Sequence, residues 1–234
     1  MAGAFFLVAP TADAADAPEI RCPIPNGASS SLATHEAGAR LRFIRSTLGD
    51  QARRAFTWSS AWSFFGVAVA GETTALAAAE NDPKKRIIWL ANGLPALGFP
   101  GLILIDPIKV MADADELENL VKDDPLETKL CENLARAEKM LSEDAADEKK
   151  KTGVFSHLLG VLANVASSAV IVIGTGEWGS AILNGVGGEA VSEFNLFTLP
   201  TGAVSAADRY RTGDLTIPNG VRMATRGLSF SLSW

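Results

Sequence analysis

Four long stretches of this 234-residue chain contain almost no charged side chains, and they constrain its fold more than any other feature. They cover residues 55–79, 87–105, 153–176 and 178–200. The second stretch has no ionisable group, and the third has only His157. A helix that crosses a bilayer needs about 20 mainly apolar residues, each rising about 1.5 Å. The sequence therefore predicts membrane-spanning helices, and a hydrophobic content of 47% agrees with that class.

The four stretches form two pairs, because the connection within each pair is short. Residues 80–86 contain Asp82-Pro83, a turn signal, and the other pair is joined around Gly174-Thr175-Gly176. Connections of this length require antiparallel neighbours. We therefore expect a mainly all-α fold with four hydrophobic helices as two antiparallel hairpins. The alternative is a soluble helical bundle with wholly buried helices that forms a homo-oligomeric assembly.

Two of the expected helices carry residues that disturb a simple span. Pro95 and Pro100 each remove a helical hydrogen bond, so the second helix is expected to be kinked and packed against protein. Glu189 and Glu193 interrupt the fourth stretch, where charges near the bilayer centre are costly. That stretch is expected to be short or partly re-entrant.

The remaining segments are polar or irregular. An apolar run at residues 4–9 followed by small residues resembles the later part of a signal peptide, although a basic start is missing. Thr34 is a candidate N-cap of a basic amphipathic helix whose arginines suit anionic head groups. The expected organisation is a signal-like segment (1–17), a linker and basic helix (18–54), hairpin 1 (55–107), a polar helical arm (108–152), hairpin 2 (153–200) and a tail (201–234).

Two local patterns predict structure in the polar arm and the tail. In the arm, Leu130, Leu134, Ala137 and Leu141 recur at helical spacing, which indicates an apolar seam inside the protein. In the tail, large apolar residues alternate with serine from residue 228 onwards, as in a strand with one apolar face. We expect a β-hairpin of residues 216–223 with 224–234.

The two cysteines, Cys22 and Cys131, lie outside the apolar stretches. Four spans place both on one side of the membrane, where an oxidising compartment would allow a disulfide. Two unrelated thiols are the alternative. The sequence has no Cys-x-x-Cys motif and no cluster of Cys and His, so it predicts neither a metal site nor a cofactor.

The paired Gly-rich hydrophobic helices, followed by Arg209-Tyr210-Arg211, resemble an uncharacterised family of bacterial envelope proteins. The resemblance implies a membrane location and no particular activity. A signal-like start places the N-terminal region, the polar arm and the C-terminal tail in the periplasm. Lys84-Lys85-Arg86 in the opposite loop agrees with the excess of positive charge on cytoplasmic loops.

Polar groups inside the apolar stretches are the candidate sites for transport or for polar contacts in the membrane: Glu72, His157, Asn164, Glu189 and Glu193. Their alternative role is an ordinary one near span ends or interfaces.

No catalytic motif is present, and a net charge of −6 argues against nucleic-acid binding. The sequence predicts a non-enzymatic integral membrane protein of the bacterial cell envelope with a structural or assembly role. Its expected partners are membrane lipid and either further copies of itself, as a homo-oligomer, or other envelope proteins. The alternative is a small transporter or channel component that uses intramembrane carboxylates.

Overall fold

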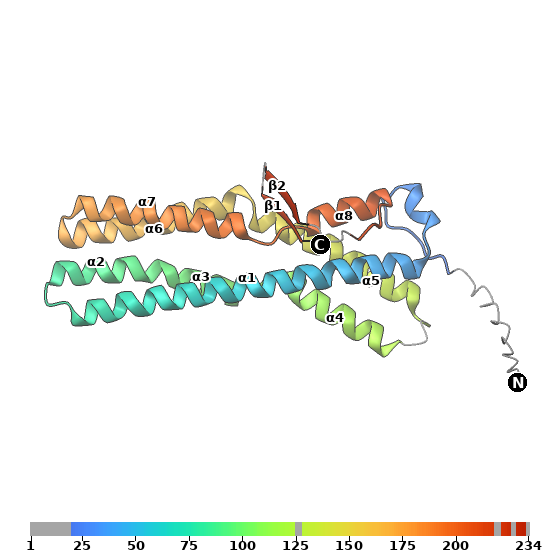
Figure 1. Ribbon diagram of the computed structural model, residues 1–234, viewed down its shortest axis with the longest axis horizontal. Helices are drawn as coiled ribbons and strands as arrows, with labels where there is room; N and C mark the ends of the chain where they lie inside the picture. The colour runs from blue at the N-terminus through green and yellow to red at the C-terminus, as the bar shows by residue number, and fades with distance from the viewer. Residues whose placement is uncertain (1–19, 125–127, 218–220, 226–227, 233–234) are drawn as a thin grey trace, which may run out of the picture.

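One helix runs through most of the molecule's length. In the computed structural model, which describes residues 20–124, 128–217, 221–225 and 228–232, α1 extends over Ala37–Ala79, or about 65 Å (Figure 1). The helix therefore continues without a break across the expected boundary at residue 54, because residues 50–57 contain no helix breaker. Thr34 is not the N-cap either. It ends the 3₁₀ helix η1 (Ser30–Thr34), and Glu36 occupies the cap. The signal-like segment 1–17 lies outside the described residues.

The first hairpin follows the end of α1. Asp82 caps α2 (Pro83–Gly93) by accepting a 2.9 Å hydrogen bond from the Lys84 backbone N–H. Proline then breaks the helix, as expected: α2 passes into the 3₁₀ turn η2 (Leu94–Leu97) and then α3 (Gly98–Ile105). At Gly66 of α1, an added Cβ would lie 2.4 Å from the carbonyl oxygen of Ala96. Only glycine permits this close approach of α1 and η2.

The polar arm is a helical hairpin of α4 (Lys109–Asp123) and α5 (Leu130–Lys151). The expected apolar seam of α5 is confirmed, since its four members are at most 5% exposed and belong to one core. This core also receives α1 and the last helix, α8 (Ala203–Thr212). The Glu148 carboxylate of α5 caps α8 and accepts hydrogen bonds of 2.8 and 2.6 Å from the N–H groups of Gly202 and Ala203.

The second hairpin consists of α6 (Val154–Thr175) and α7 (Trp178–Thr198). Gly176, with φ 76°, makes the left-handed turn between them. The expected interruption of the fourth stretch is absent, because α7 is a regular helix of 21 residues. Glu189 and Glu193 do not interrupt it, since both side chains bond to α6.

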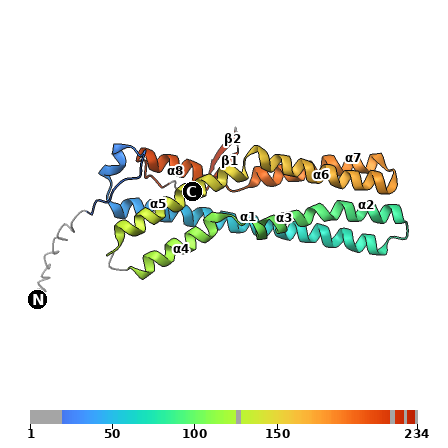
Figure 2. The same ribbon diagram turned by 180° about the vertical axis from the view of Figure 1, so that it is seen from behind.

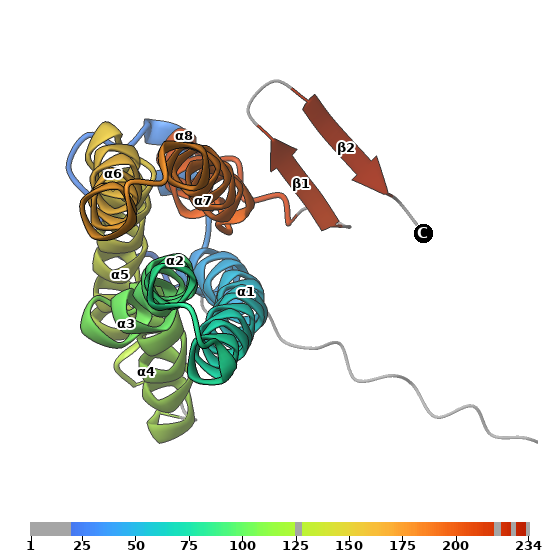
Figure 3. The same ribbon diagram turned by 90° about the vertical axis from the view of Figure 1, so that its left-hand side faces the viewer.

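The molecule has two ends of different character (Figures 1 and 2). We call the first the head: residues 20–54, α4, α5 and α8. We call the second the apolar bundle: residues 55–79 of α1, α2, η2, α3, α6 and α7. Viewed along the long axis, α6 and α7 lie beside one another, as do α1 and α2 (Figure 3). Packing of α2 on α6 joins the two hairpins.

Two short strands follow α8. β1 (Val221–Thr225) pairs antiparallel with β2 (Leu228–Leu232), with Val221 opposite Leu232. The predicted hairpin of residues 216–234 stays a prediction, because residues 218–220, 226–227 and 233–234 lie outside the described part.

Candidate functional site

Four of the five candidate polar residues meet in the seam between α6 and α7. Nearest the head, His157 Nδ1 lies 2.7 and 2.9 Å from the two carboxylate oxygens of Glu193. With an ionised Glu193, which offers only acceptors, this hydrogen bond requires the proton on Nδ1. The pair crosses from one helix of the hairpin to the other, and both side chains are about two-fifths exposed.

Two turns further from the head on α6, the buried Asn164 links the same two helices. Its Nδ2 group donates to the Gly160 carbonyl at 2.9 Å, to Glu189 Oε2 at 3.1 Å and to Ser192 Oγ at 3.1 Å. A Cβ on Gly188 would lie 2.2 Å from Asn164 Oδ1, so glycine makes room for the amide. Asn164 and Glu189 therefore form a second polar contact across the seam.

A third polar contact was not predicted from the sequence. The buried Ser167 donates a 2.6 Å hydrogen bond to the Ala91 carbonyl of α2 and accepts one of 2.9 Å from Asn184 Nδ2. It thereby joins both hairpins. Neutral serine and asparagine do not stand out among many small residues. The spacing of three residues between Asn164 and Ser167, which puts both on one face of α6, is the signal that could have identified the serine.

Glu72 does not join this group. It is exposed on α1 and bonds to none of the described residues. The tryptophans at the start of the first stretch also differ from simple interface anchors. The Nε1 groups of Trp58 and Trp62 donate to Thr198 Oγ1 at 3.2 and 3.1 Å, which fastens α1 to the end of α7.

The outer surface of the apolar bundle consists mainly of large hydrophobic side chains, whereas polar contacts link its helices. With the exceptions of Ile20 and Ile217, every exposed large hydrophobic residue found among the described residues lies on this bundle. On α6 and α7 they are Val154, Phe155, Leu158, Leu159, Val161, Leu162, Val165, Val170, Ile173, Trp178, Ile182, Leu183, Val186, Phe194 and Phe197. The buried apolar cluster of the bundle is small by comparison, namely Ala91, Ile171 and Ala181.

By length and composition, two helical segments of the described chain are able to cross a membrane: Pro83–Asp123 and Leu130–Thr175. Their most apolar windows have mean hydropathies of 1.7 and 2.0, and only 18% and 22% of these windows are buried. Such low burial differs from that of a core helix in a water-soluble protein, which is mostly covered.

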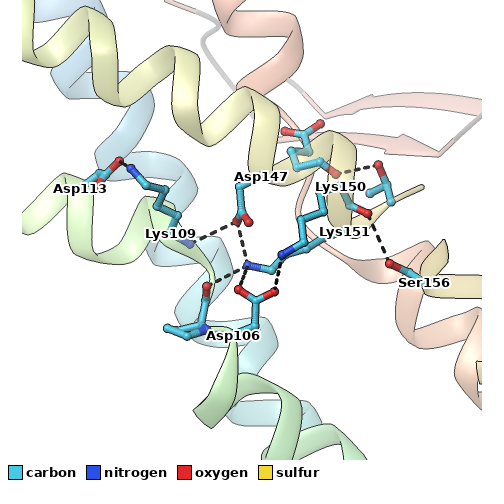
Figure 4. Close-up of polar contacts among 10 residues, drawn as sticks. Asp106, Lys109, Asp113, Asp147, Lys150, Lys151 and Ser156 are labelled. Carbon is cyan, nitrogen blue, oxygen red and sulfur yellow. Dashed lines mark hydrogen bonds and ion pairs between the residues drawn. The ribbon is translucent and has the colours of Figure 1, made fainter. Parts of the chain in front are cut away.

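A belt of ion pairs lies where the head meets the bundle (Figure 4). Lys150 and Lys151, at the end of α5, reach Asp106 at the end of α3 at 3.1 and 3.6 Å. The hydrogen bond from Lys150 lowers the pKa of Asp106. Lys151 also pairs with Asp147 at 2.8 Å. These contacts fix the end of α3 nearest the head and the end of α5 nearest the bundle relative to each other.

The ion-pair belt continues at the start of α4. Lys109 Nζ lies 2.9 Å from Asp113 and 2.5 Å from Glu143. Partial burial opposes its charge, but the hydrogen bonds to Glu143 and Asp113 outweigh that effect and raise the pKa of Lys109. Lys109 is therefore held as a cation between α4 and α5.

The head is organised around a buried arginine. Arg40 is 1% exposed, and its guanidinium donates to the Tyr210 hydroxyl at 2.9 Å and to the carbonyls of Cys22 and Pro23 at 3.0 and 2.9 Å. Glu138 supplies the opposite charge and also accepts from Tyr210. Burial opposes the charge on Arg40, but its hydrogen bonds to Tyr210 and Glu138 raise the pKa. The basic helix suggested that its arginines lie against lipid head groups. Arg40 does not, because it is buried inside the head.

The cysteine pairing is present in the structure. Cys22 and Cys131 form a disulfide with a Cα–Cα distance of 5.3 Å, which ties the N-terminal loop to α5. The loop held in this way provides the two carbonyls that bind Arg40. Beside the disulfide is an open groove of about 490 Å³ lined in part by Pro23, Ile24 and Glu132.

Among the described residues, no group of three or more His, Cys, Asp and Glu side chains has the arrangement to hold a metal ion. Comparison with protein-family models, curated proteins and solved structures finds no match. The chemistry of the chain therefore has to be inferred from its own side chains.

Proposed function

We propose that this protein is a non-enzymatic integral membrane protein of the bacterial cell envelope, with a structural or assembly role. The apolar bundle lies in the bilayer, and the head lies in the periplasm. The observation that carries the proposal is the distribution of side chains in the bundle, which has polar groups inside and large apolar groups outside. In water, exposing one such side chain instead of burying it costs about 1.5–3 kcal/mol.

The dimensions of the bundle agree with a bilayer. The 22 residues of α6 and the 21 of α7 correspond to about 33 and 31 Å, close to the hydrocarbon thickness of about 30 Å. Lipid offers no hydrophobic force between helices, so helices associate through small residues and hydrogen bonds. Gly188, Asn164 and Ser167 provide such contacts in the seam.

A soluble homo-oligomer would have to cover these apolar side chains with other copies. On α6 the inward face is narrow, and exposed apolar residues such as Leu158, Leu162 and Val165 surround the rest of the helix. Lipid would cover the exposed apolar residues on every side of the helix. A single protein interface would cover those on only one side.

A substitution on the exposed face of α6 is expected to have opposite effects in a bilayer and in a soluble bundle. Val165, 59% exposed at the middle of α6, is changed to glutamate, and Ala146, exposed in the head, receives the same change as a control. In lipid, the charge costs about 2.5–3.5 kcal/mol, so V165E reduces the membrane-bound fraction while A146E does not. In a soluble bundle, V165E would instead improve solubility. Extraction of the unmodified protein by carbonate without detergent would also refute the proposal.

The orientation rests on the disulfide and on the loop charges. The head carries Cys22–Cys131, which suits an oxidising compartment, and Lys84, Lys85 and Arg86 lie at the opposite tip of the bundle. A cysteine introduced at Asn81 in the tip loop should be labelled only from the cytoplasmic side. Labelling from the periplasm would reverse the orientation.

A second function has a specific observation in its favour, namely the chain of polar contacts inside the bundle. Ionisable groups within membrane helices serve in proton and ion paths in many transporters. In the transport version of this proposal, His157, Glu189 and Glu193 carry the moving charge. Ion or proton flux in proteoliposomes that is lost in E189Q and E193Q, and retained in E72Q, would support transport. Equal flux in all variants and in protein-free vesicles would exclude it.

A further inference from the structure

The head contains a buried carboxyl group whose oxygens accept no hydrogen bond from the described residues. Asp144 of α5 is 2% exposed, and both of its side-chain oxygens are buried without a hydrogen bond to the rest of the described chain. A buried ionised carboxylate without a partner is strongly unfavourable. The group must therefore either bind something or lose its charge.

The cations near Asp144 are engaged elsewhere. On α4, Lys109 is bound by Asp113 and Glu143, while on α5, Lys151 is bound by Asp147 and by Asp106 of α3. None of these pairs includes Asp144.

The other acidic groups add to the negative charge around it. Asp113 faces Asp144 from α4 and is itself 7% exposed, and Asp147 lies one turn along α5. Glu148 is occupied by the N-terminus of α8. Next to Asp144, α1 contributes the neutral Gln51, and the segment before α8 contributes Leu199 and Pro200.

A small cavity adjoins the carboxyl group. It has a volume of about 20 Å³ and is lined by Asp144, Gln51, Asp147 and Glu148, among others. About 10–15 Å³ is enough for one water molecule, provided that it has polar partners. The cavity thus has the size and the polar lining for one water molecule. The described side chains lack the arrangement to hold a metal ion. The cation that fits beside Asp144 is therefore a proton.

We propose that Asp144 is a proton-binding site, which holds its proton at neutral pH beside Asp113 and a single water and releases it in mildly alkaline solution. Burial raises the pKa of Asp144 to about 8, and the Asp113 carboxylate adds to the rise. Release creates a buried negative charge between α4 and α5. Since both helices lead into the apolar bundle, the site makes the junction of head and bundle sensitive to pH.

The sign of the effect follows from proton linkage. An ordinary aspartic acid has a pKa of about 3.9, so the unfolded chain has already lost this proton at neutral pH while the folded chain keeps it. Stability therefore falls as pH rises from about 4 to about 8, and it levels off above the folded pKa. Within that window, the site changes the unfolding equilibrium constant by about tenfold per pH unit.

The test compares Asp144→Asn with the wild type, since an amide resembles the protonated carboxyl in shape and lacks the titration. Asp115→Asn, on the exposed face of α4, is the matched control. Thermal unfolding of the full chain in phosphatidylcholine nanodiscs is followed between about pH 5 and about pH 9. We expect the wild type and D115N to lose stability with rising pH relative to D144N, with a plateau above about pH 8. Parallel profiles of the wild type and D144N would overturn the proposal.

A second measurement is independent of whether D144N folds. Infrared spectra of the wild type should show the C=O stretch of a protonated carboxylic acid at neutral pH, and the band should disappear above about pH 8. A spectrum at neutral pH without a protonated carboxyl would refute the proton site directly.

Discussion

The buried Arg40–Glu138 pair leads to the sharpest prediction about stability. In Glu138→Gln, an oxygen still faces the guanidinium, but the negative charge is gone and Arg40, 1% exposed, is left without its counter-charge. Removing one partner of a buried ion pair costs about 3–5 kcal/mol. Because glutamine keeps an acceptor and the carbonyls of Cys22 and Pro23 still bind the guanidinium, we expect about 3 kcal/mol.

For a chain of this length, 1 kcal/mol corresponds to about 2–4 °C in Tm, so E138Q should lower Tm by about 6–12 °C. The control is Glu118→Gln. Glu118 also pairs with an arginine of α1, Arg45, through two 2.7 Å hydrogen bonds, but their side chains are 37% and 45% exposed. Exposed pairs contribute at most about 1 kcal/mol, so E118Q should lower Tm by less than about 4 °C. Unfolding is followed by near-ultraviolet circular dichroism in nanodiscs. Equal shifts for the two variants would refute the reasoning.

Three further perturbations test the packing. Gly66→Ala places a methyl group against a backbone carbonyl and should cost about 1–3 kcal/mol in thermal unfolding, whereas Gly71→Ala, with open space around its Cβ, should be neutral or slightly stabilising. Thr198→Val removes the acceptor of both indole N–H groups and should shift the tryptophan fluorescence while lowering stability by about 1–3 kcal/mol. Replacing Cys22 and Cys131 by serine removes a disulfide between residues 109 positions apart in sequence. The free energy of unfolding, measured by denaturant titration, should fall by about 4–5 kcal/mol. Added reductant should have the same effect on the wild type.

The sequence predicted those features that depend on local pattern and on connection length. Short loops made the two hairpins unavoidable, and Pro95 marked the break between α2 and α3. The helical spacing from Leu130 to Leu141 identified the seam of α5, because a periodic apolar face has to be covered. Placing both cysteines at one end of the hairpins allowed their disulfide but left two unrelated thiols as the alternative, and the structure shows the disulfide.

Features that depend on distant partners were not predictable in this way. The side chains that bind Arg40 lie 98 and 170 residues away, and nothing in its own helix distinguishes it from the other arginines. Asp144 is one acid among several neighbours on α5, and only the fold shows that it alone is buried without a bond. The glutamates of α7 suggested an interruption because their partners on α6 were unknown.

The core of the head draws on three separate parts of the chain, and this has a consequence for biosynthesis. Leu48 of α1 precedes the first hairpin, Leu134 of α5 lies between the hairpins, and Ala206 of α8 follows the second. In the proposed bilayer, these parts can meet only after both hairpins have been inserted with the same orientation. A chain with one inverted hairpin would strand α8 in the opposite compartment and leave its complementary surface uncovered. The head core therefore forms only in correctly inserted chains. In an incorrectly inserted chain, its apolar surface stays exposed to quality-control proteases that recognise such surfaces.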